Sequence, residues 1–289
     1  VKMTYNSYQI AEIIGVNVST IKRWTDSGKL KCFQSVGGHR KFHLNHIAEF
    51  LKKNNKTSTD INISDLVGKN IKLANAIDKE NYKYLVKYSY ENLISGKADR
   101  FMSLNDSLIL KNYKIHDIFD RILNPTLKKI GDQWTQGNLS ITEEHMASEI
   151  IKKFLTNINF QYLSINNKYN AFSFTLFEDK HDIPLHMSEA VFNHAGNIKT
   201  FNLGQNLPVD DFLNLAQKVT PNLIFISIIY IQDLDKINQE VNLLLKSFSN
   251  NETTIFLKGR TDELRLNYSN FIPVKDYNHL YNYISENIK

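Results

Sequence analysis

Cysteine is almost absent from this chain of 289 residues, because Cys32 is the only one and no disulfide can form within the chain. A lone thiol is typical of proteins in a reducing cytoplasm. Long apolar stretches are missing as well, since no run reaches the roughly 18 residues that span a bilayer. Val1–Tyr5 also lacks the apolar core of a secretory signal. We therefore expect a cytoplasmic protein without membrane segments.

Sequence motifs of the common enzyme classes are missing too. The chain has no glycine-rich phosphate loop, no zinc-ligand spacing and no arrangement of Ser, His and Asp that indicates nucleophilic catalysis. We therefore expect no enzymatic activity. Apolar residues make up 42% of the chain, which is enough for buried cores, and the length fits two or three domains.

Positive charge is concentrated at the start of the chain. Val1–Lys56 carries ten Lys and Arg against Glu12, Asp26 and Glu49, a net charge of +7, whereas the remainder carries −2. A basic segment joined to a near-neutral body favours a head that binds a polyanion. On charge alone, an ordinary solvated surface explains the pattern equally well.

Three regions differ in their apolar pattern, and they predict a multidomain α and α/β protein. Residues 1–56 read as a small DNA-binding domain, followed by a polar linker over Asn55–Asp60. Residues 61–166 show helical spacing throughout and predict a four-helix bundle, with Pro125 as a kink. The four predicted helices are Asp78–Ser95, Arg100–Lys111, Ile115–Trp134 and Thr142–Ser164.

Residues 169–289 alternate between short apolar runs and helical stretches, which predicts a parallel α/β domain of the Rossmann-like, flavodoxin-like kind. The predicted strands are Ala171–Phe177, Ile198–Asn202, Leu223–Ile229 and Thr253–Leu257. The predicted helices are Leu185–His194, Val209–Val219, Leu234–Phe248 and Asp262–Leu266.

The head carries the pattern of a winged helix-turn-helix. We expect Ser7 to cap a first helix, Gly15 to make the turn, and Asn17 or Ser19 to begin a second helix. A glycine pair, Gly37-Gly38, then predicts a hairpin wing. The expected DNA contacts are Ser19, Thr20, Lys22 and Arg23 on the second helix, and His39, Arg40 and Lys41 at the tip of the wing. The alternative is a three-helix module that binds protein.

The recognition helix and wing resemble the MerR superfamily. Ile21-Lys22-Arg23-Trp24 is similar to its recognition helix, and Gly37-Gly38-His39-Arg40 followed by Lys41-Phe42 is similar to its wing. The resemblance implies a transcription regulator that binds two-fold operator DNA.

The helical region resembles the cobalamin-dependent photoreceptors of that superfamily, the CarH/LitR-like branch. Trp134, nine intervening residues and then Glu144-His145 match the lid over the upper face of the corrin in that family. Read from the residues alone, Trp134 is better explained as a core residue and Glu144 as a helix cap. The resemblance implies that all three face a ligand.

The α/β region resembles the cobalamin-binding domain of the same family in the loop after its first strand. The family motif is Asp-x-His-x-x-Gly, which implies that His181 ligates cobalt and that Asp179 orients its ring. Ser227 and Gly259 match two further binding positions, although Ile229 stands where the family has Leu. Without the resemblance, His181 would read as an ordinary loop histidine.

Two positions depart from that family pattern. Pro184 replaces the glycine of the motif, and Arg260 stands where a second glycine follows the fourth strand. Proline fixes φ and removes an N–H, and both residues add bulk where the nucleotide tail of the cofactor needs room. These changes predict weakened cobalamin binding.

The resemblance as a whole implies a repressor that binds operator DNA as a dimer or tetramer, with adenosylcobalamin as a light-sensitive ligand. RNA polymerase is a further candidate partner. The alternative is a cofactor-free regulator whose cobalamin-like domains serve oligomerisation or protein binding. A cobalamin carrier or enzyme subunit is a third reading, which DNA binding would exclude.

Overall fold

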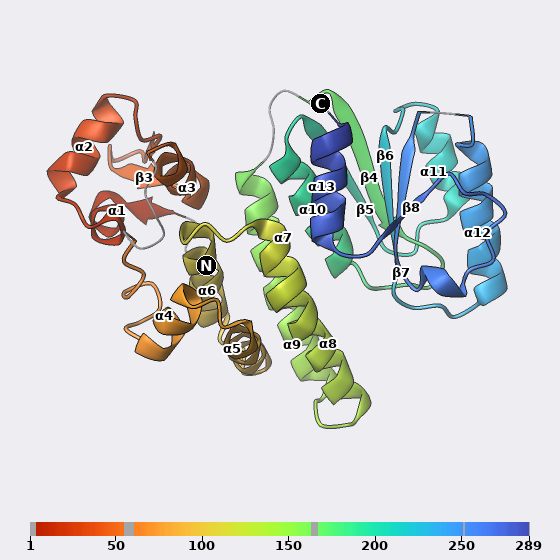
Figure 1. Ribbon diagram of the computed structural model, residues 1–289, viewed down its shortest axis with the longest axis horizontal. Coiled ribbons are helices and arrows are strands. Elements are labelled where there is room, and N and C mark those ends of the chain that lie inside the picture. Colours follow the sequence, from red (N-terminus) through yellow and green to blue (C-terminus); the bar gives the residue numbers. More distant parts are fainter. Residues whose placement is uncertain (1–3, 55–60, 163–166, 251, 289) are drawn as a thin grey trace. The chain divides into compact units, whose positions relative to one another are not determined.

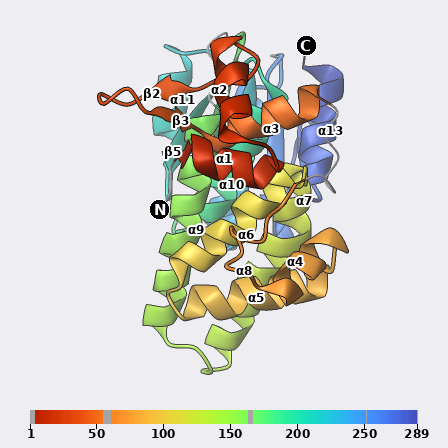
Figure 2. The same ribbon diagram turned by 90° about the vertical axis from the view of Figure 1, so that its left-hand side faces the viewer.

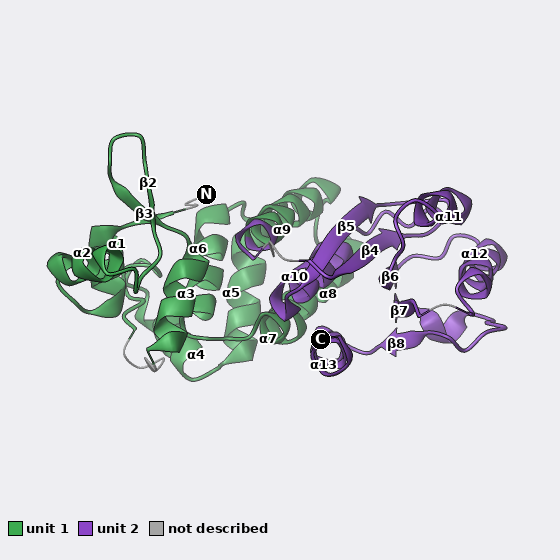
Figure 3. Ribbon diagram, turned by 90° about the horizontal axis from the view of Figure 1, so that it is seen from above, with its two compact units in different colours: residues 1–157 green, residues 158–289 purple. Residues whose placement is uncertain are grey.

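The chain forms two compact units in the computed structural model, Val1–Asn157 and Ile158–Lys289 (Figure 3). The structure describes residues 4–54, 61–162, 167–250 and 252–288. The predicted linker Asn55–Asp60 and the predicted end of the fourth helix, residues 163–164, lie outside the described residues. No described helix has both the length and the apolar character needed to cross a membrane.

The first unit begins with a winged helix-turn-helix, the head. Its elements are β1 (Tyr5–Asn6), α1 (Ser7–Ile14), α2 (Val18–Asp26), β2 (Phe33–Gln34), β3 (Arg40–Phe42) and α3 (Leu44–Lys53). The three strands form an antiparallel sheet in the order β1-β3-β2. The hairpin of β2 and β3 projects from the head as the predicted wing (Figure 2). Ile10, Ile21 and Ile47 are fully buried between the helices.

The cap of α1 differs from the expectation. Asn6, not Ser7, is the N-cap, and it forms a capping box in which its side chain accepts from the Gln9 N–H while its own N–H donates to Gln9 Oε1, both at 3.0 Å. The helix begins one residue early because β1 leads directly into it. Gly15 ends α1 at φ 72°, a conformation that favours glycine.

Helices fill the rest of the first unit. They are α4 (Ile71–Asp78), α5 (Tyr82–Ile94), α6 (Ala98–Leu110), α7 (Ile115–Ile118), the π-helical turn η2 (Phe119–Leu123), α8 (Asn124–Thr135) and α9 (Ile141–Gln161), which runs past the boundary of the unit. The four predicted helices correspond to α5, α6, α7–α8 and α9. Leu85, Leu104, Ile118 and Leu155 are fully buried in this bundle.

Two details of the bundle depart from the prediction. Asp78–Ser95 was expected as one helix, but α4 ends at Asp78 and Asn81 caps α5 by accepting from the Tyr84 N–H. Glu80 adopts a positive φ of 50° in the turn between them. Pro125 was expected to kink the third helix, and the helix takes a π turn immediately before it. Such turns absorb the hydrogen bond that proline cannot donate.

The head contacts the bundle within the first unit. The Tyr5 hydroxyl of β1 donates to Asp106 Oδ2 of α6 at 2.5 Å, and the Asn62 N–H donates to the Ile13 carbonyl at 2.9 Å. Tyr5 is almost fully buried. Burial, and then the neighbouring Asp106 carboxylate, raise the pKa of Tyr5 far above its usual range, so the phenol stays protonated as a donor.

Tyr5→Phe should lower the free energy of unfolding of the first unit by about 1–3 kcal/mol, because Asp106 loses a buried donor. Both tryptophans, Trp24 and Trp134, lie in this unit, so tryptophan fluorescence in a urea titration measures the change. Tyr8→Phe is the matched control, because the Tyr8 ring is 73% exposed. Equal midpoints for the two variants would contradict the stabilising role of the hydrogen bond.

The second unit is a five-stranded parallel sheet with helices on both faces (Figure 1). Its elements are β4 (Tyr169–Thr175), α10 (Ile183–Ala195), β5 (Ile198–Gly204), α11 (Val209–Ala216), β6 (Leu223–Ile228), α12 (Leu234–Ser247), β7 (Thr254–Gly259), the 3₁₀ turn η3 (Thr261–Glu263), β8 (Ile272–Val274) and α13 (Tyr277–Asn287). The strand order β5-β4-β6-β7-β8 is that of flavodoxin-like folds. The predicted Rossmann-like class is therefore confirmed.

The last part of this unit was predicted least well. Asp262–Leu266 was expected as a helix but forms only the single turn η3, and neither β8 nor α13 was predicted. β8 is a three-residue edge strand that contains Pro273, which weakens any strand signal in the sequence. The α10–α13 pair covers one face of the sheet and the α11–α12 pair the other.

Candidate functional site

The recognition helix α2 buries one side and exposes the other. Ile21 is fully buried, and the Trp24 ring lies 4.7 Å from the Phe50 ring of α3, centroid to centroid. Lys22 and Arg23 are exposed. A helix with two exposed cations opposite its buried face is suited to the major groove of DNA. Of the other two predicted contacts, Ser19 is exposed and Thr20 is half-buried.

The wing is closed by a tight turn between β2 and β3. The Gly38 N–H donates to the Ser35 carbonyl at 2.8 Å, the Ser35 N–H donates to the His39 carbonyl at 2.9 Å, and Gly38 has φ 74°. Val36 and His39 are exposed at the tip. The tip therefore offers one imidazole and one apolar side chain to a neighbouring surface.

Arg40 and Lys41 were expected at the tip but lie in β3 and are half-buried. The Arg40 guanidinium forms an ion pair with Asp26 Oδ1 at 2.5 Å. Asp26 is the last residue of α2, so Arg40 ties the wing to the end of the recognition helix. A phosphate that approached Arg40 would have to share it with Asp26.

Trp134, Glu144 and His145 lie in the first unit, at the end of α8 and the start of α9. Trp134 is 49% exposed, so the alternative of a core tryptophan is wrong. Glu143, not Glu144, makes the helix cap: Ser140 N–H and Oγ donate to Glu143 Oε2, and the Glu143 N–H donates to Ser140 Oγ. These bonds lower the pKa of Glu143.

Glu144 is thereby available for other contacts. One of its carboxylate oxygens lies 2.5 Å from His145 Nδ1, and the other accepts from the Ser148 hydroxyl at 2.7 Å. The His145 side chain is 69% exposed. The end of α8 therefore exposes an indole, and the start of α9 exposes an imidazole beside a carboxylate.

In the second unit, the Asp179 carboxylate holds the loop that follows β4 at the carboxyl edge of the sheet. Asp179 is buried, with 1% of its surface exposed. Its Oδ1 accepts from the His181 N–H and lies 2.7 Å from His181 Nδ1. Its Oδ2 accepts from the N–H groups of Ile229 and Tyr230, which follow β6. One carboxylate thus fixes both the imidazole and the neighbouring loop.

Hydrogen bonding decides the ionisation of Asp179. Burial by itself would raise its pKa, but the bonds from the His181 ring and from the backbone of Tyr230, Ile229 and His181 outweigh burial, and the pKa lies below its usual range. The His181 side chain is 55% exposed. Its Nδ1 faces the carboxylate, so Nε2 is the ring nitrogen that could ligate a metal.

The lowered pKa of Asp179 predicts how the stability of the fold changes with pH. Because the folded-state pKa lies below the unfolded value of 3.8, the stabilisation is fully present above about pH 4 and is lost as pH falls through the lower folded value. Wild type should therefore exceed Asp179→Asn in stability at pH 7, and the gap should close in stronger acid. The urea midpoints of the two proteins, compared at pH 7 and in stronger acid, measure this gap in stability. A gap that does not change with pH would contradict the ionised state.

Three predicted positions at the same sheet edge have different surroundings. Ser227, at the end of β6, is fully buried, and its Oγ has no hydrogen-bond partner among the described residues. Gly259 has φ 109°, and a Cβ there would lie 2.1 Å from the Ile228 carbonyl oxygen, so the adjacent strand alone requires the glycine. The Arg260 guanidinium makes two 2.6 Å bonds to the Glu263 carboxylate. Arg260 is thus held towards η3.

Pro184 lies in the first turn of α10, where proline is tolerated. Its carbonyl accepts from the Tyr277 hydroxyl of α13 at 3.2 Å. Pro184 is therefore compatible with the start of α10, and its carbonyl links α10 to α13.

Several residues that build this loop were missed by the sequence reasoning. The Thr175 hydroxyl donates to the Asp179 carbonyl and accepts from the Asn206 N–H, and the Asn206 side chain accepts from the Glu178 N–H. Glu178 and Asn206 adopt positive φ angles of 59° and 52°. The only available signal was the position of each residue at the end of a strand or just after it.

Comparison with known proteins agrees with this order of domains. Residues 4–55 match the model of a helix-turn-helix domain, and residues 90–158 match the model of a B12 binding domain. The HTH-type transcriptional repressor CarH of Myxococcus xanthus is 21% identical over 236 residues, which is 78% of each chain. The chain is thus CarH-like over most of its length. It combines a DNA-binding domain with a B12 binding domain.

A solved structure supports the fold independently. The monomethylamine corrinoid protein of Methanosarcina barkeri superposes with a TM-score of 0.56 at 12% identity, over 71% of this chain and 98% of its own. At that identity the likeness shows the fold alone.

The donor set at the loop after β4 suits a corrinoid. Among the described residues, no cluster of three or more His, Cys, Asp and Glu side chains could hold a bare metal ion. A corrinoid already carries four nitrogen ligands in its ring and needs from the protein one imidazole, which His181 can supply. Ser227 Oγ is buried and has no hydrogen-bond partner in the described part of the chain, so it is the kind of group that a cofactor would satisfy.

Proposed function

We propose that this chain is a cobalamin-dependent transcription regulator of the MerR kind, which binds operator DNA through α2 and the wing. The observation that carries the proposal is the Asp179–His181 pair at the carboxyl edge of the sheet, on the same chain as an exposed recognition helix. The similarity to a transcriptional repressor over 78% of each chain supports it. The experiment that tests it is a visible spectrum of the purified chain after addition of cobalamin.

In this proposal His181 is the protein ligand of cobalt through Nε2. Asp179 orients the His181 ring through Nδ1. Ser227 hydrogen-bonds the nucleotide tail of the cofactor. Trp134, Glu144 and His145 form the ligand-facing rim of the helical domain, as the family resemblance implies. Bound adenosylcobalamin supplies a light-sensitive cobalt–carbon bond, which makes light the signal.

Cobalamin affinity should rise when Pro184→Gly and Arg260→Gly are combined. If each native side chain costs ~2 kcal/mol of steric overlap with the tail, the double change strengthens binding by roughly a thousandfold. Spectral titration of each variant measures it. Tight binding by the unmodified chain would show that the two side chains do not obstruct the tail, which the Arg260–Glu263 ion pair would explain.

DNA binding should need at least two copies of the chain, because operators read by such heads are two-fold symmetric. A footprint on a selected operator should cover two half-sites, and ultracentrifugation of the complex should give a dimer or tetramer. Monomeric stoichiometry on a single half-site would contradict this expectation.

A cofactor-free regulator is the second candidate, favoured by Pro184 and Arg260 at positions where the family carries glycine. It predicts no cobalamin spectrum even for the double glycine variant, with operator binding intact. We propose no catalytic role for this chain, since the matched relative is a repressor and the head is a helix-turn-helix domain.

A further inference from the structure

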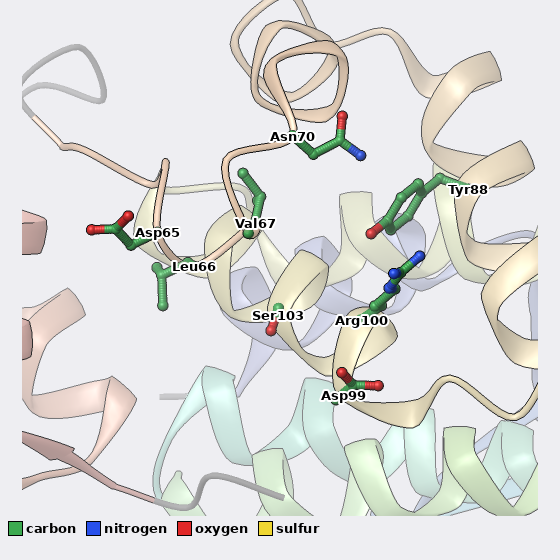
Figure 4. Close-up of a pocket in the computed structure, with 9 residues that line it drawn as sticks. Asp65, Leu66, Val67, Asn70, Tyr88, Asp99, Arg100 and Ser103 are labelled. Atoms are coloured by element: carbon green, nitrogen blue, oxygen red, sulfur yellow. The ribbon is translucent and has the colours of Figure 1, made fainter.

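Two cavities in the first unit differ in the charges that line them. The cavity in Figure 4 measures about 290 Å³ and carries Arg100 together with the carboxylates of Asp65 and Asp99. Because it presents both signs of charge, it selects no ligand by charge. The second cavity measures about 450 Å³ and lies between α5 and α8, and every charged residue that lines it is a cation. We call it the α5–α8 groove.

Residues at four-residue spacing on two neighbouring helices build the α5–α8 groove. Tyr82 and Val86 lie on one face of α5, and Arg121 and Pro125 face them from η2 and α8. Side chains four apart lie above one another on a helix, so each helix contributes a continuous edge. Val86 is half-buried and Pro125 is exposed. The floor of the groove is therefore apolar and open to solvent.

The cations of the groove are held in place by aromatic rings at its two ends. The Arg121 guanidinium lies 3.8 Å from the Tyr82 ring centroid, and Lys129 Nζ lies 4.1 Å from the Tyr90 ring centroid. Such contacts orient a cation without neutralising it. Lys83 is exposed on the α5 side, so positive charge lines both edges of the groove.

No described carboxylate lines the groove itself, although Asp117 shares a neighbouring cavity of about 200 Å³ with Arg121. Glu91 lies 3.8 Å from Lys87 Nζ, and both side chains are more than half exposed. A pair so exposed contributes little. Glu80 hydrogen-bonds the Tyr82 hydroxyl rather than a cation of the groove. The groove thus keeps a positive rim around an apolar floor.

We propose that the α5–α8 groove binds an amphipathic helix of a partner protein, apolar along one stripe and acidic on both flanks of that stripe. An amphipathic helix that lies in a groove between two helices uses apolar anchors at helical spacing, and Val86 and Pro125 are the apolar side chains that such anchors would contact. Its acidic flanks meet Lys83 and Lys87 on one side and Arg121 and Lys129 on the other. A nucleic-acid backbone would use the cations but leave the apolar floor without a contact.

The test uses the full chain and two synthetic 18-residue helical peptides, with Leu along one stripe and either Glu or Lys on both flanks. Fluorescence anisotropy should show binding of the Glu peptide and at least tenfold weaker binding of the Lys peptide. Lys83→Glu combined with Lys87→Glu should weaken the Glu peptide at least tenfold. Lys72→Glu with Lys97→Glu is the matched control, because both side chains are exposed and neither lines the groove.

Four results would overturn the proposal. They are absence of binding by the Glu peptide, equal binding of both peptides, displacement of the Glu peptide by duplex DNA that lacks the operator, and a changed oligomeric state of Lys83→Glu/Lys87→Glu in ultracentrifugation. The third would assign the groove to nucleic acid and the fourth to a second copy of the chain. Operator affinity of the same double variant is expected to stay unchanged, which separates this test from that of the proposed function.

Discussion

His181→Ala should remove the His-ligated cobalamin spectrum altogether, because no other imidazole is held at the carboxyl edge of β4 by a buried carboxylate in the part of the chain that the structure describes. His181 approaches Asp179 Oδ1 through Nδ1 at 2.7 Å, and the ring would present Nε2 to cobalt. The visible spectrum of the reconstituted chain measures the change. An unaltered spectrum would mean that the cofactor binds elsewhere or keeps its own base as ligand.

Asp179→Asn should weaken cobalamin binding only in part, in contrast to His181→Ala. Loss of a carboxylate that orients a ligating histidine typically weakens metal affinity by about 10–100-fold. The Ile229 and Tyr230 N–H groups would still find an amide oxygen to donate to, so the loop should keep its fold. His279→Ala is the matched control, because His279 lies in α13 and has no assigned role. Equal losses in Asp179→Asn and in the control would contradict the orienting role.

Lys22→Ala and Arg23→Ala should each weaken operator binding by roughly 5–150-fold, because a lost base contact costs about 1–3 kcal/mol. Both side chains are exposed on the face of α2 opposite Ile21. Anisotropy titrations of a duplex selected by the chain from a random pool measure the loss. Lys79→Ala is the control, since Lys79 is exposed in the turn after α4. Unchanged curves for both variants would remove α2 from the DNA interface.

Arg40→Ala separates two roles for the wing. If Arg40 contacts only phosphate, its loss should flatten the salt dependence of operator binding by about one unit and weaken binding through that electrostatic contribution alone. Because Arg40 is paired with Asp26 at the end of α2, we expect the intrinsic affinity to fall as well. Asp26→Asn should then reproduce the fall in affinity without the change in salt slope. If Asp26→Asn binds as wild type does, the ion pair has no part in DNA binding.

The sequence predicted most where a pattern repeats. Ile10, Ile21 and Ile47 of the head, and the apolar strands β4 to β7, form the expected core because period and burial agree there. The Asp179–His181 pair was predicted from a short motif, and the structure brings the two side chains together. A short motif can predict a contact of this kind because its residues are close in sequence.

Contacts between distant residues could not be predicted in this way. The anchoring of Asp179 by Ile229 and Tyr230 joins residues 50 and 51 apart, and the Tyr5–Asp106 bond joins residues 101 apart. No local period encodes such pairs. The Arg40–Asp26 pair and the groove cations at Tyr82 and Tyr90 likewise arise only when separate elements pack together.

The most direct test of a cobalamin-dependent regulator is the operator affinity of the full chain with and without adenosylcobalamin in the dark, measured by anisotropy on the selected duplex. We predict tighter binding with the cofactor, by at least about fivefold, the lower end of ordinary coupling between two sites. His181→Ala should abolish the difference while keeping basal DNA binding. Superimposable curves with and without a spectroscopically bound cofactor would contradict the link between cobalamin and DNA.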